Sequence, residues 1–410
     1  MICSCASGFA VKESRKVSQD FLGISPHSYY FTENGKQLLD DLGIVWLRRD
    51  AGWNSLEPVQ GEWNFSDLDK NIENDLQNGK KLIIILDYDT PWIYADNKNH
   101  KNITAKELPH YLNFVKTIVM RYKGKVAAWE IWNEPNGVFW KGSEKDFFEL
   151  TKNTARLIRE LDPESKIIIG ALSWVPAGLV KRMLKSGAAE NADAFSFHPY
   201  DLNPRRVVAL ADKMEKIAAS CNFEGELWVT ETGYPTAGWY PHKASEKRFP
   251  EYIIKTLAGF AVRPVRVAAW YELFNSYNKG KEKSKLNSED YFGLVYPDYS
   301  RKDGAAAFAL CGKYIQGRTY LPDPAQKKNA GGSIESMIFK DDNGNNTLIL
   351  WNNALGAKKL NVTLQGTNIK QHNIATGEAL PLHETLEINI DRTPVFITWD
   401  GEAAGVILSR

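Results

Sequence analysis

The sequence has few cysteines, almost no net charge and no long apolar run. Four cysteines stand among its 410 residues, and their spacing fits neither a disulfide framework nor a metal site. Lys and Arg number 51 against 50 Asp and Glu, so the formal net charge is +1. This balance gives no electrostatic reason to expect nucleic acid or an acidic polymer as a partner. Because no run of about 18 apolar residues occurs, the sequence also predicts no transmembrane segment.

The first residues bear on targeting. Residues 2–5, Ile-Cys-Ser-Cys, are similar to the end of a bacterial lipoprotein signal, but the basic and apolar regions that precede such a motif are missing. Either the sequence starts downstream of the true start or the match arises by chance. On the first interpretation residues 1–19 are a tail with a signal remnant. The protein is then expected to be extracytoplasmic: secreted, periplasmic or lipid-anchored at Cys5.

The composition supports a large core with an excess of aromatic side chains. Hydrophobic residues make up 43% of the chain and aromatic residues 12%, with 13 Trp and 17 Tyr. The length suits a barrel of about 250–320 residues followed by a small module. The aromatic excess is compatible with stacking on sugars, although much of it must belong to the core.

Hydrophobic runs that end in polar or turn residues predict eight strands, with amphipathic helical segments between them. The helical pattern is clearest at Glu33–Leu42, Leu108–Tyr122, Glu144–Leu161 and Glu246–Phe260. A strand followed by a helix, repeated eight times, predicts an α/β fold, a (β/α)8 TIM barrel over residues 20–322. The expected strands are Asp20–Ser25, Ile44–Arg48, Lys81–Leu86, Val126–Trp132, Lys166–Gly170, Ala194–Phe197, Leu227–Thr230 and Val265–Trp270.

The pattern changes near Pro322. From Gly331 onwards the chain shows alternating strands and hairpin turns, with 342–344 (Asp-Asn-Gly) as one turn. Residues 322–324 (Pro-Asp-Pro) are typical of a linker. Residues 323–410 are therefore predicted to form a small C-terminal β-sandwich. We expect it to brace the barrel, because its strands offer no aromatic platform for a sugar.

The stretch Val126–Asn136 is an apolar run that ends abruptly in Asn-Glu-Pro. Such a run is typical of a buried strand in a parallel sheet, and Pro135 stops it, which leaves Glu134 at the strand's carboxyl end. In a (β/α) barrel this end carries the catalytic residues. A carboxyl beside large aromatic residues there is expected to have a raised pKa and to act as a general acid, because desolvation disfavours its charged form. The alternative is a glutamate that caps the next helix.

A second segment, Gly225–Pro235, has the same pattern: an apolar strand, then Glu231, then glycine and proline. Glu231 lies 97 positions after Glu134, which is about three βα units of roughly 30 residues each. Two carboxyls at the same end of one barrel are the minimum equipment for glycoside hydrolysis. The pair is a much stronger signal than either glutamate alone.

Further motifs follow the other strands. They are WLRRDAGW and SLEPVQGEWNF after the second strand, SFHPY on the sixth, VTETGYP on the seventh, AAWYELF on the eighth and YFGLV before the last helix. With WNEPN they make the chain resemble a clan A retaining glycoside hydrolase. Within the clan it is most similar to family 39, which holds bacterial exopolysaccharide endoglycosidases and β-xylosidases. The resemblance implies hydrolysis of β-linked sugars with retention.

Carried over by position, Glu134 resembles the clan's acid/base, Glu231 its nucleophile and Asn133 the residue that binds the sugar 2-hydroxyl. Arg48 resembles the arginine that holds the nucleophile's charge. Strand alternation points Arg48 into the barrel and Arg49 toward the helices, although a register slip of one residue would reverse them. The alternative for Arg48 is an ordinary ion pair with a loop aspartate.

The resemblance also assigns residues to the sugar site. His198 and Tyr200 resemble the histidine and tyrosine beside the bond that is cut, and Trp270 resembles an indole beneath the reacting sugar. His27, after the first strand, is a further candidate for the same site. The alternatives are a structural histidine and a core tryptophan.

The sequence therefore predicts a monomeric protein that acts on a β-linked polysaccharide or oligosaccharide and uses neither cofactor nor metal. One rival is a catalytically inactive barrel that only binds carbohydrate, and another is a family 5-like β-glycanase of the same clan. A metal-dependent barrel enzyme would need clusters of His, Asp and Glu at the strand ends, which His198 alone does not provide.

Overall fold

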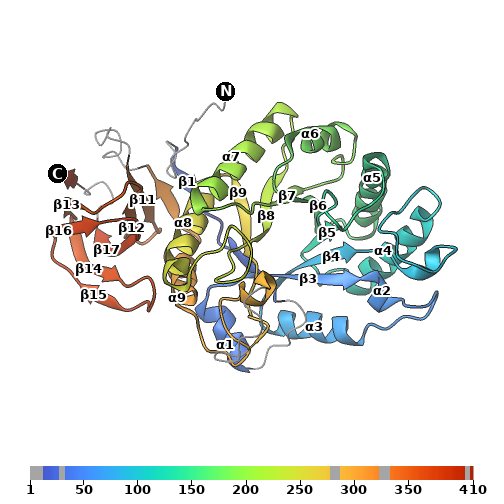
Figure 1. Cartoon of the computed structure of the whole chain (residues 1–410), viewed down its shortest axis with the longest axis horizontal. Helices are drawn as coiled ribbons and strands as arrows, with labels where there is room; N and C mark the ends of the chain where they lie inside the picture. Colours follow the sequence, from blue (N-terminus) through green and yellow to red (C-terminus); the bar gives the residue numbers. More distant parts are fainter. Residues whose placement is uncertain (1–12, 27–32, 278–286, 323–332, 402–406, 410) are drawn as a thin grey trace.

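The computed structural model describes residues 13–26, 33–277, 287–322, 333–401 and 407–409. They form a closed parallel barrel surrounded by helices, with two antiparallel sheets beside it (Figure 1). The predictions for Cys5 and His27 fall outside the described residues. Among the described helices, none combines the length and apolar character that crossing a membrane requires.

The barrel contains all eight strands expected from the sequence, paired in chain order and closed by the last strand on the first. Their side chains are almost all buried, because one face of each strand fills the barrel and the other packs under the helices. The (β/α)8 prediction is confirmed. The strands are β2 (Leu22–Ile24), β3 (Trp46–Gly52), β4 (Lys81–Asp87), β5 (Ala128–Ile131), β6 (Lys166–Ser173), β7 (Ala194–His198), β8 (Glu226–Thr232) and β9 (Val265–Trp270).

Helices follow the strands and cover the barrel. Their starts follow local chemistry: the Ser143 hydroxyl accepts a hydrogen bond from the Asp146 amide at the start of α5, and Asn203 caps α7 in the same way through Arg206. The α-helices are α1 (Glu33–Asp41), α2 (Trp53–Leu56), α3 (Ser66–Gln77), α4 (Leu108–Tyr122), α5 (Glu144–Leu161), α6 (Ala177–Lys185), α7 (Pro204–Ser220), α8 (Phe249–Ala261) and α9 (Asp303–Tyr314). Short 3-10 turns are η1 (Pro91–Ile93), η2 (Glu246–Arg248) and η3 (Ser288–Tyr291).

The C-terminal region is a β-sandwich, as predicted. Its larger sheet has the order β1-β10-β11-β12-β17-β14-β15 and its smaller sheet the order β16-β13-β18. Ten buried residues, among them Leu348, Leu360 and Trp399, pack between the sheets. The strands are β1 (Arg15–Lys16), β10 (Thr319–Leu321), β11 (Ile334–Lys340), β12 (Asn345–Asn352), β13 (Lys358–Thr363), β14 (Gly366–His372), β15 (Ala379–Pro381), β16 (Thr385–Ile390), β17 (Val395–Gly401) and β18 (Ile407–Ser409).

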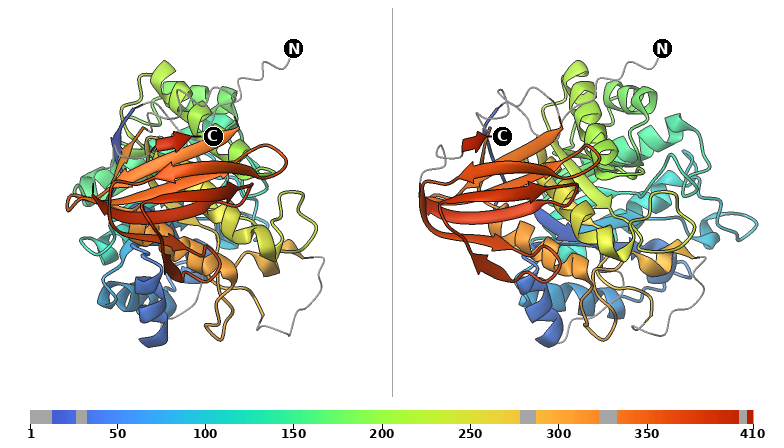
Figure 2. Two further views of the ribbon diagram at one scale, coloured as in Figure 1. Left: turned by 90° about the vertical axis from the view of Figure 1, so that its left-hand side faces the viewer. Right: turned by 60° about the vertical axis from the view of Figure 1, so that its left-hand side comes forward.

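The larger sheet packs against the barrel on the side of α8 and α9 (Figures 1 and 2). Alternation along its strands explains this: Leu348 faces the sandwich interior, whereas Ile349 and Trp351 belong to the barrel's core cluster. Lys255 of α8 lies 5.3 Å from the Trp351 ring. Every residue of α8 is buried, which is expected of a helix covered on both sides.

Two short strands correct the predicted domain boundaries. β1 pairs with β10, and β10 pairs with β11, so both join the larger sheet of the sandwich. Residues 15–16 were expected in an N-terminal tail and residues 319–321 in the barrel. The chain thus enters and leaves the barrel through the same sheet, which ties the two parts together at two points.

Candidate active site

A cleft of about 570 Å³ opens at the carboxyl ends of the barrel strands. It contains both glutamates predicted from the sequence, Glu134 and Glu231, and also Arg48, Asn133 and Tyr200. Six further aromatic side chains line it: Tyr88, Phe139, Trp174, Tyr240, Tyr271 and Phe292. Strand ends from β3 to β9 therefore converge on one polar floor with aromatic walls.

A cavity of similar volume lies at the opposite end of the barrel, beside the first residues of β8 and β9. Its lining includes Arg15, Lys16, Glu226 and Arg266. In a TIM barrel this end serves stability, and catalytic groups gather at the other. We therefore place the candidate active site in the cleft that holds Glu134 and Glu231.

The backbone after β5 turns sharply to present Glu134. Trp132 and Glu134 have φ values of 67° and 44°, in the left-handed region that bulky residues rarely adopt. Such a conformation costs of order 1–3 kcal/mol and persists where the surroundings impose it. Here the Glu134 amide donates to the Ala171 carbonyl at 2.9 Å. The turn leaves the Glu134 carboxyl facing the cleft and the Trp132 indole buried behind it.

Glu134 contacts His198, which is fully buried at the end of β7. The distance from Glu134 Oε1 to His198 Nδ1 is 3.0 Å, and His198 Nε2 lies 3.2 Å from Thr230 Oγ1. Burial raises the pKa of Glu134, but the hydrogen bond and charge of His198, together with Arg48, hold this pKa below its usual value. The expected raised pKa is therefore wrong for the free protein, because the sequence could not reveal that His198 packs against this carboxyl.

Glu231, on β8, is held by two donors. Tyr200 Oη donates to Glu231 Oε1 at 2.7 Å, and Arg48 Nη1 donates to Glu231 Oε2 at 3.1 Å. Burial and then the negative charge of Glu231 raise the pKa of Tyr200 well above its usual value, so its hydroxyl keeps the proton that it donates. These two hydrogen bonds hold the Glu231 carboxylate in place and complement its negative charge.

Arg48 lies inside the barrel and links three acidic or polar partners, as alternation predicted. Its Nε donates to Glu130 Oε2 at 2.6 Å and its Nη2 to Asn133 Oδ1 at 2.8 Å, in addition to the Glu231 contact. Burial lowers the pKa of Arg48, but the charges of Glu130 and Glu231 outweigh this and raise it above its usual value. Arg49 faces the helices instead and pairs with Asp75 of α3 at 2.9 Å.

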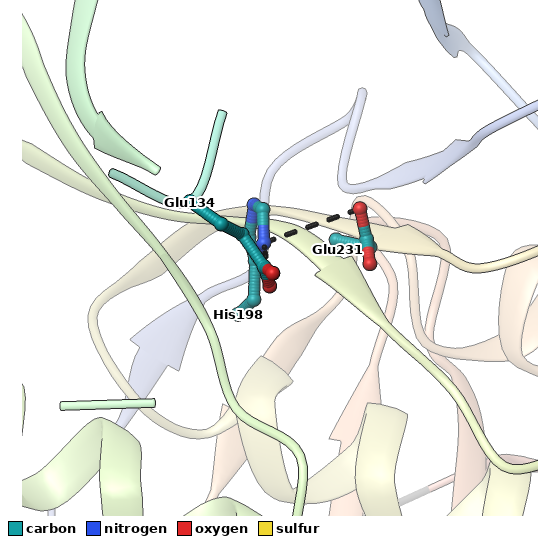
Figure 3. Close-up of side chains that lie close together, drawn as sticks. All are labelled: Glu134, His198 and Glu231. Atoms are coloured by element: carbon teal, nitrogen blue, oxygen red, sulfur yellow. Dashed lines mark hydrogen bonds and ion pairs between the residues drawn. The ribbon is translucent and has the colours of Figure 1, made fainter. Parts of the chain in front are cut away.

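Figure 3 shows Glu134, His198 and Glu231 converging across the cleft floor. Three potential ligand atoms of these residues lie within 4.8 Å of one another, a spacing that a metal ion can use. However, His198 Nδ1 already contacts Glu134, and the Arg48 guanidinium lies 3.1 Å from Glu231. A metal ion bound here would have to replace the hydrogen between His198 and Glu134, and it would lie close to the positive charge of Arg48. These residues fit a shared proton better than a metal ion.

A second pair of carboxyls lies beside the cleft. Asp50 lines it, and Asp87 is buried at the end of β4 with no hydrogen-bond donor to either carboxyl oxygen among the described residues. Burial, and then the charge of Asp50, raise the pKa of Asp87 well above its usual value. A raised pKa favours the neutral, protonated form of the Asp87 carboxyl.

We expect Asp87→Asn to stabilise the protein more at pH 8 than at pH 5. Because the folded-state pKa is raised, the Asp87 contribution to stability is present at low pH and is lost as pH rises above the unfolded pKa. Asparagine carries no charge at either pH, so it avoids the cost of a buried charge next to Asp50. Thermal unfolding at both pH values measures the difference.

The matched comparison is Asp89→Asn. Asp89 accepts hydrogen bonds from the Tyr94 hydroxyl and from the His100 and Lys101 amides, so its substitution should destabilise at both pH values. Equal destabilisation at pH 5 and pH 8 in Asp87→Asn would show that Asp87 is ionised, contrary to this prediction.

Trp270 does not line the cleft, which corrects the prediction of an indole platform. Its side chain is 0% exposed, and its ring packs near Tyr234, Phe249 and Phe308. The following residue, Tyr271, lines the cleft instead. His198 is likewise shielded from the cleft and contacts Glu134, whereas it was expected to line a sugar subsite.

Sequence reasoning missed most of the aromatic wall. Trp174 lines the cleft just after β6 and is 60% exposed, yet it was not singled out. An exposed tryptophan just past a strand end was the available signal. Trp53 and Trp140 also follow strand ends, but they are buried in the core. Trp239 is 66% exposed and contacts the cleft residue Tyr240 at a ring distance of 4.4 Å.

Residues 10–262 match the family model described as Cellulase (glycosyl hydrolase family 5). Endo-1,4-beta-xylanase 3 of Hypocrea jecorina is 29% identical over 159 residues, which cover 33% of this chain and 41% of the relative. Beta-xylosidase of Caldicellulosiruptor saccharolyticus is 27% identical over 255 residues, which cover 56% of this chain and 49% of the relative. The chain thus spans less than half the length of either curated relative.

Solved structures share the whole architecture. A family 39 glycoside hydrolase from Bacteroides cellulosilyticus WH2 superposes with a TM-score of 0.76 at 18% identity and covers 94% of this chain and 81% of that one. A GH39 beta-xylosidase from Caulobacter crescentus gives a TM-score of 0.67 at 16% identity, with 95% and 98% covered. At these low sequence identities the similarity shows a shared fold only. The shared fold includes the C-terminal sandwich, because the superpositions cover nearly all of this chain.

Proposed function

Because this chain belongs to the cellulase family, glycosyl hydrolase family 5, we propose that it hydrolyses β-linked glycosidic bonds with retention. The chain is a glycosidase of clan A, as its motifs predicted. In the proposed double displacement Glu231 is the nucleophile and Glu134 the acid/base. The motifs also predicted a similarity to family 39, and the solved family 39 structures share the fold of this chain.

One observation carries the proposal: a carboxyl oxygen of Glu134 and one of Glu231 lie within 4.8 Å of each other across the cleft floor. Retaining enzymes have their two carboxyls about 5–5.5 Å apart, whereas inverting enzymes need about 6.5–9.5 Å to admit a water molecule between carboxyl and sugar. The short separation supports direct attack by a protein carboxylate.

In the first step Glu231 Oε2 or Oε1 attacks the anomeric carbon while Glu134 gives its proton to the departing oxygen. Arg48 and Tyr200 donate hydrogen bonds to the Glu231 carboxylate and orient it for the attack. Asn133 Oδ1 is occupied by Arg48, and its amide nitrogen donates to the Tyr88 hydroxyl at 3.0 Å. Its second amide hydrogen remains to bind the sugar 2-hydroxyl, the role assigned by resemblance.

In the second step water hydrolyses the glycosyl-enzyme. Glu134, now without its proton, takes one from the water, whose oxygen bonds to the anomeric carbon, and the Glu231 carboxylate departs. The two inversions give net retention. No cofactor enters either step.

The proposed substrate is a β-1,4-linked glycan, with xylan-type and cellulose-type chains as the first to test. The curated relatives are named as xylanases and a β-xylosidase, and the cleft offers aromatic faces suited to pyranose rings. A polymeric substrate also supports the extracytoplasmic location proposed from the Cys5 motif, since polymers do not cross a cytoplasmic membrane.

The proposed mechanism is tested by following hydrolysis of an oligosaccharide or aryl β-glycoside by proton NMR. The β-anomer of the product should appear first and then mutarotate. Initial release of the α-anomer would overturn retention. Polysaccharide binding without any hydrolysis would favour the rival, an inactive carbohydrate-binding barrel.

We expect Trp174→Ala to lower kcat/KM on long oligosaccharides by roughly tenfold, equivalent to about 1.4 kcal/mol of lost binding. Trp174 is exposed at the rim, on the loop that follows the Ser173 end of β6 and near the Glu134 side of the cleft. Its indole offers a flat apolar face to a sugar beyond the cleaved bond. The measurement is kcat/KM against chain length.

A short aryl glycoside does not reach the rim, so its hydrolysis should be unchanged in this variant. The matched control is Trp63→Ala, because Trp63 packs on Phe65 away from the cleft. An equal loss on short and long substrates would contradict the role of Trp174 as an outer platform.

A further inference from the structure

Glu130 is a fully buried carboxylate at the centre of the barrel and can only accept hydrogen bonds. It receives Arg48 Nε at 2.6 Å on Oε2, and Ser196 Oγ at 2.6 Å and Thr230 Oγ1 at 2.7 Å on Oε1. Burial raises the pKa of Glu130, but Arg48 and the other contacts outweigh it and hold this pKa below its usual value. Glu130 therefore has no proton to donate.

The charge on Glu130 fixes the direction of the next hydrogen bond. A threonine hydroxyl carries a single hydrogen, and at 2.7 Å from a carboxylate oxygen that hydrogen must point to Glu130. Thr230 Oγ1 can then only accept from His198 Nε2, which lies 3.2 Å away. His198 Nε2 is consequently protonated.

The other ring nitrogen of His198 is then constrained as well. In a neutral imidazole with hydrogen on Nε2, Nδ1 is a bare lone pair. It lies 3.0 Å from Glu134 Oε1, and two lone pairs at this distance repel. The contact needs exactly one hydrogen, carried either by Glu134 or by His198 Nδ1.

We propose that Thr230 and Glu130 are positioning residues that fix the His198 tautomer and so keep the acid proton stored between His198 Nδ1 and Glu134. This inference rests on the proposed function of Glu134 as acid/base. It extends that function by three residues from three strands: Glu130 of β5, His198 of β7 and Thr230 of β8 act in sequence on Glu134.

The stored proton serves both chemical steps. When Glu134 protonates the leaving oxygen, the O–H bond to Glu134 breaks and His198 is left neutral with its Nδ1 lone pair facing the new carboxylate. That repulsion makes Glu134 a stronger base toward the water of the second step, which returns one proton to the pair. Proton number is the same before and after each turnover.

Other charges around His198 do not replace this proton. Glu231 Oε2 lies 4.0 Å from His198 Nδ1, and its donors are Arg48 and Tyr200. Arg48 sends its remaining hydrogen bonds to Glu130 and Asn133. Arg48, the cation that contacts Glu231, therefore has its described hydrogen bonds divided among Glu130, Asn133 and Glu231 and donates none of them to Glu134.

The test is Thr230→Val, which keeps the shape and removes the acceptor for His198 Nε2. His198 is then free to place its hydrogen on Nδ1 while neutral and to donate to a Glu134 carboxylate. We expect the basic limb of the kcat/KM–pH profile to move down by about one unit. For substrates with poor leaving groups kcat/KM should fall roughly 10- to 100-fold, a partial loss of the roughly 10²- to 10⁴-fold that general acid catalysis contributes.

A dinitrophenyl glycoside, whose leaving group needs no proton, should be cleaved at nearly the wild-type rate in the first step. Thr230→Ser retains the acceptor and should restore the wild-type profile. Thr154→Val is the control for loss of a buried hydroxyl, because Thr154 Oγ1, in α5, has no hydrogen-bond partner within the described part of the chain. If Thr230→Val does not fold, Thr230→Ala removes the same acceptor.

Nitrogen-15 NMR of the imidazole provides a readout independent of activity. Above the basic limb the wild type should show the Nε2–H tautomer of His198, and Thr230→Val should shift it toward Nδ1–H. An unchanged tautomer, or an equal rate loss on all leaving groups with an unmoved pH limb, would overturn the inference. If the wild type cleaves no glycoside, the proposed function fails, but the tautomer measurement still decides the relay.

Discussion

Glu231→Ala should reduce hydrolysis by at least about 10⁴-fold, as loss of a covalent nucleophile does in other enzymes, and azide should restore turnover of an activated β-glycoside. Alanine leaves space where the Glu231 carboxylate lies, facing Arg48 and Tyr200. Azide enters from the face opposite the leaving group, forms a C–N bond and expels the aglycone. The product should be the α-glycosyl azide, identified by proton NMR.

Glu134→Ala is the matched control because it removes the other carboxyl. Glu231 still forms the glycosyl-enzyme from an activated substrate, and azide then attacks this intermediate from the β face. Its product should therefore be the β-glycosyl azide. If both variants gave the same anomer, or if azide rescued neither, the assignment of the two roles would be wrong.

The barrel could be predicted because its strands are buried on both faces and appear as continuous apolar runs. The strand boundaries were less predictable where the interior is polar. β3 extends to Gly52, but its residues Arg48 and Asp50 interrupt the apolar run, so the expected strand stopped early. The sequence signal of β14 is weak for a related reason: the stretch Gly366–His372 is mostly polar, and only two of its seven residues are buried.

Within the site, the sequence predicted the positions of residues that lie on strands or at their ends. It did not predict the positions that depend on packing between distant segments. Alternation along β3 distinguished Arg48 from Arg49, because the pleat of a strand is local geometry. It could not decide between Trp270 and Tyr271, since the chain leaves the sheet at that point and the next side chain enters the cleft. The partner of His198 depends on contacts between three distant segments, which no local pattern records.

Arg48→Met should both inactivate and destabilise the protein. It leaves Glu130 buried without its cation and Glu231 without one of its two donors. Removing one partner of a buried ion pair typically destabilises by about 3–5 kcal/mol, because the remaining charge is uncompensated. We expect a loss of that order in chemical denaturation. The kcat should fall at least about 100-fold, since Glu231 would lose the cation that orients its carboxylate and complements its charge.

The double variant Arg48→Met/Glu130→Gln separates these two effects. Glutamine at position 130 removes the buried negative charge that has lost its partner, so much of the stability should return. The kcat should stay low, because Glu231 still lacks the contact with Arg48. Arg49→Met is the matched control: its partner Asp75 has a pKa that burial already raises, and the pair lies among the helices. It should lower stability and leave kcat unchanged. Recovery of kcat in the double variant would mean that Arg48 acts through barrel stability and not through the nucleophile's charge.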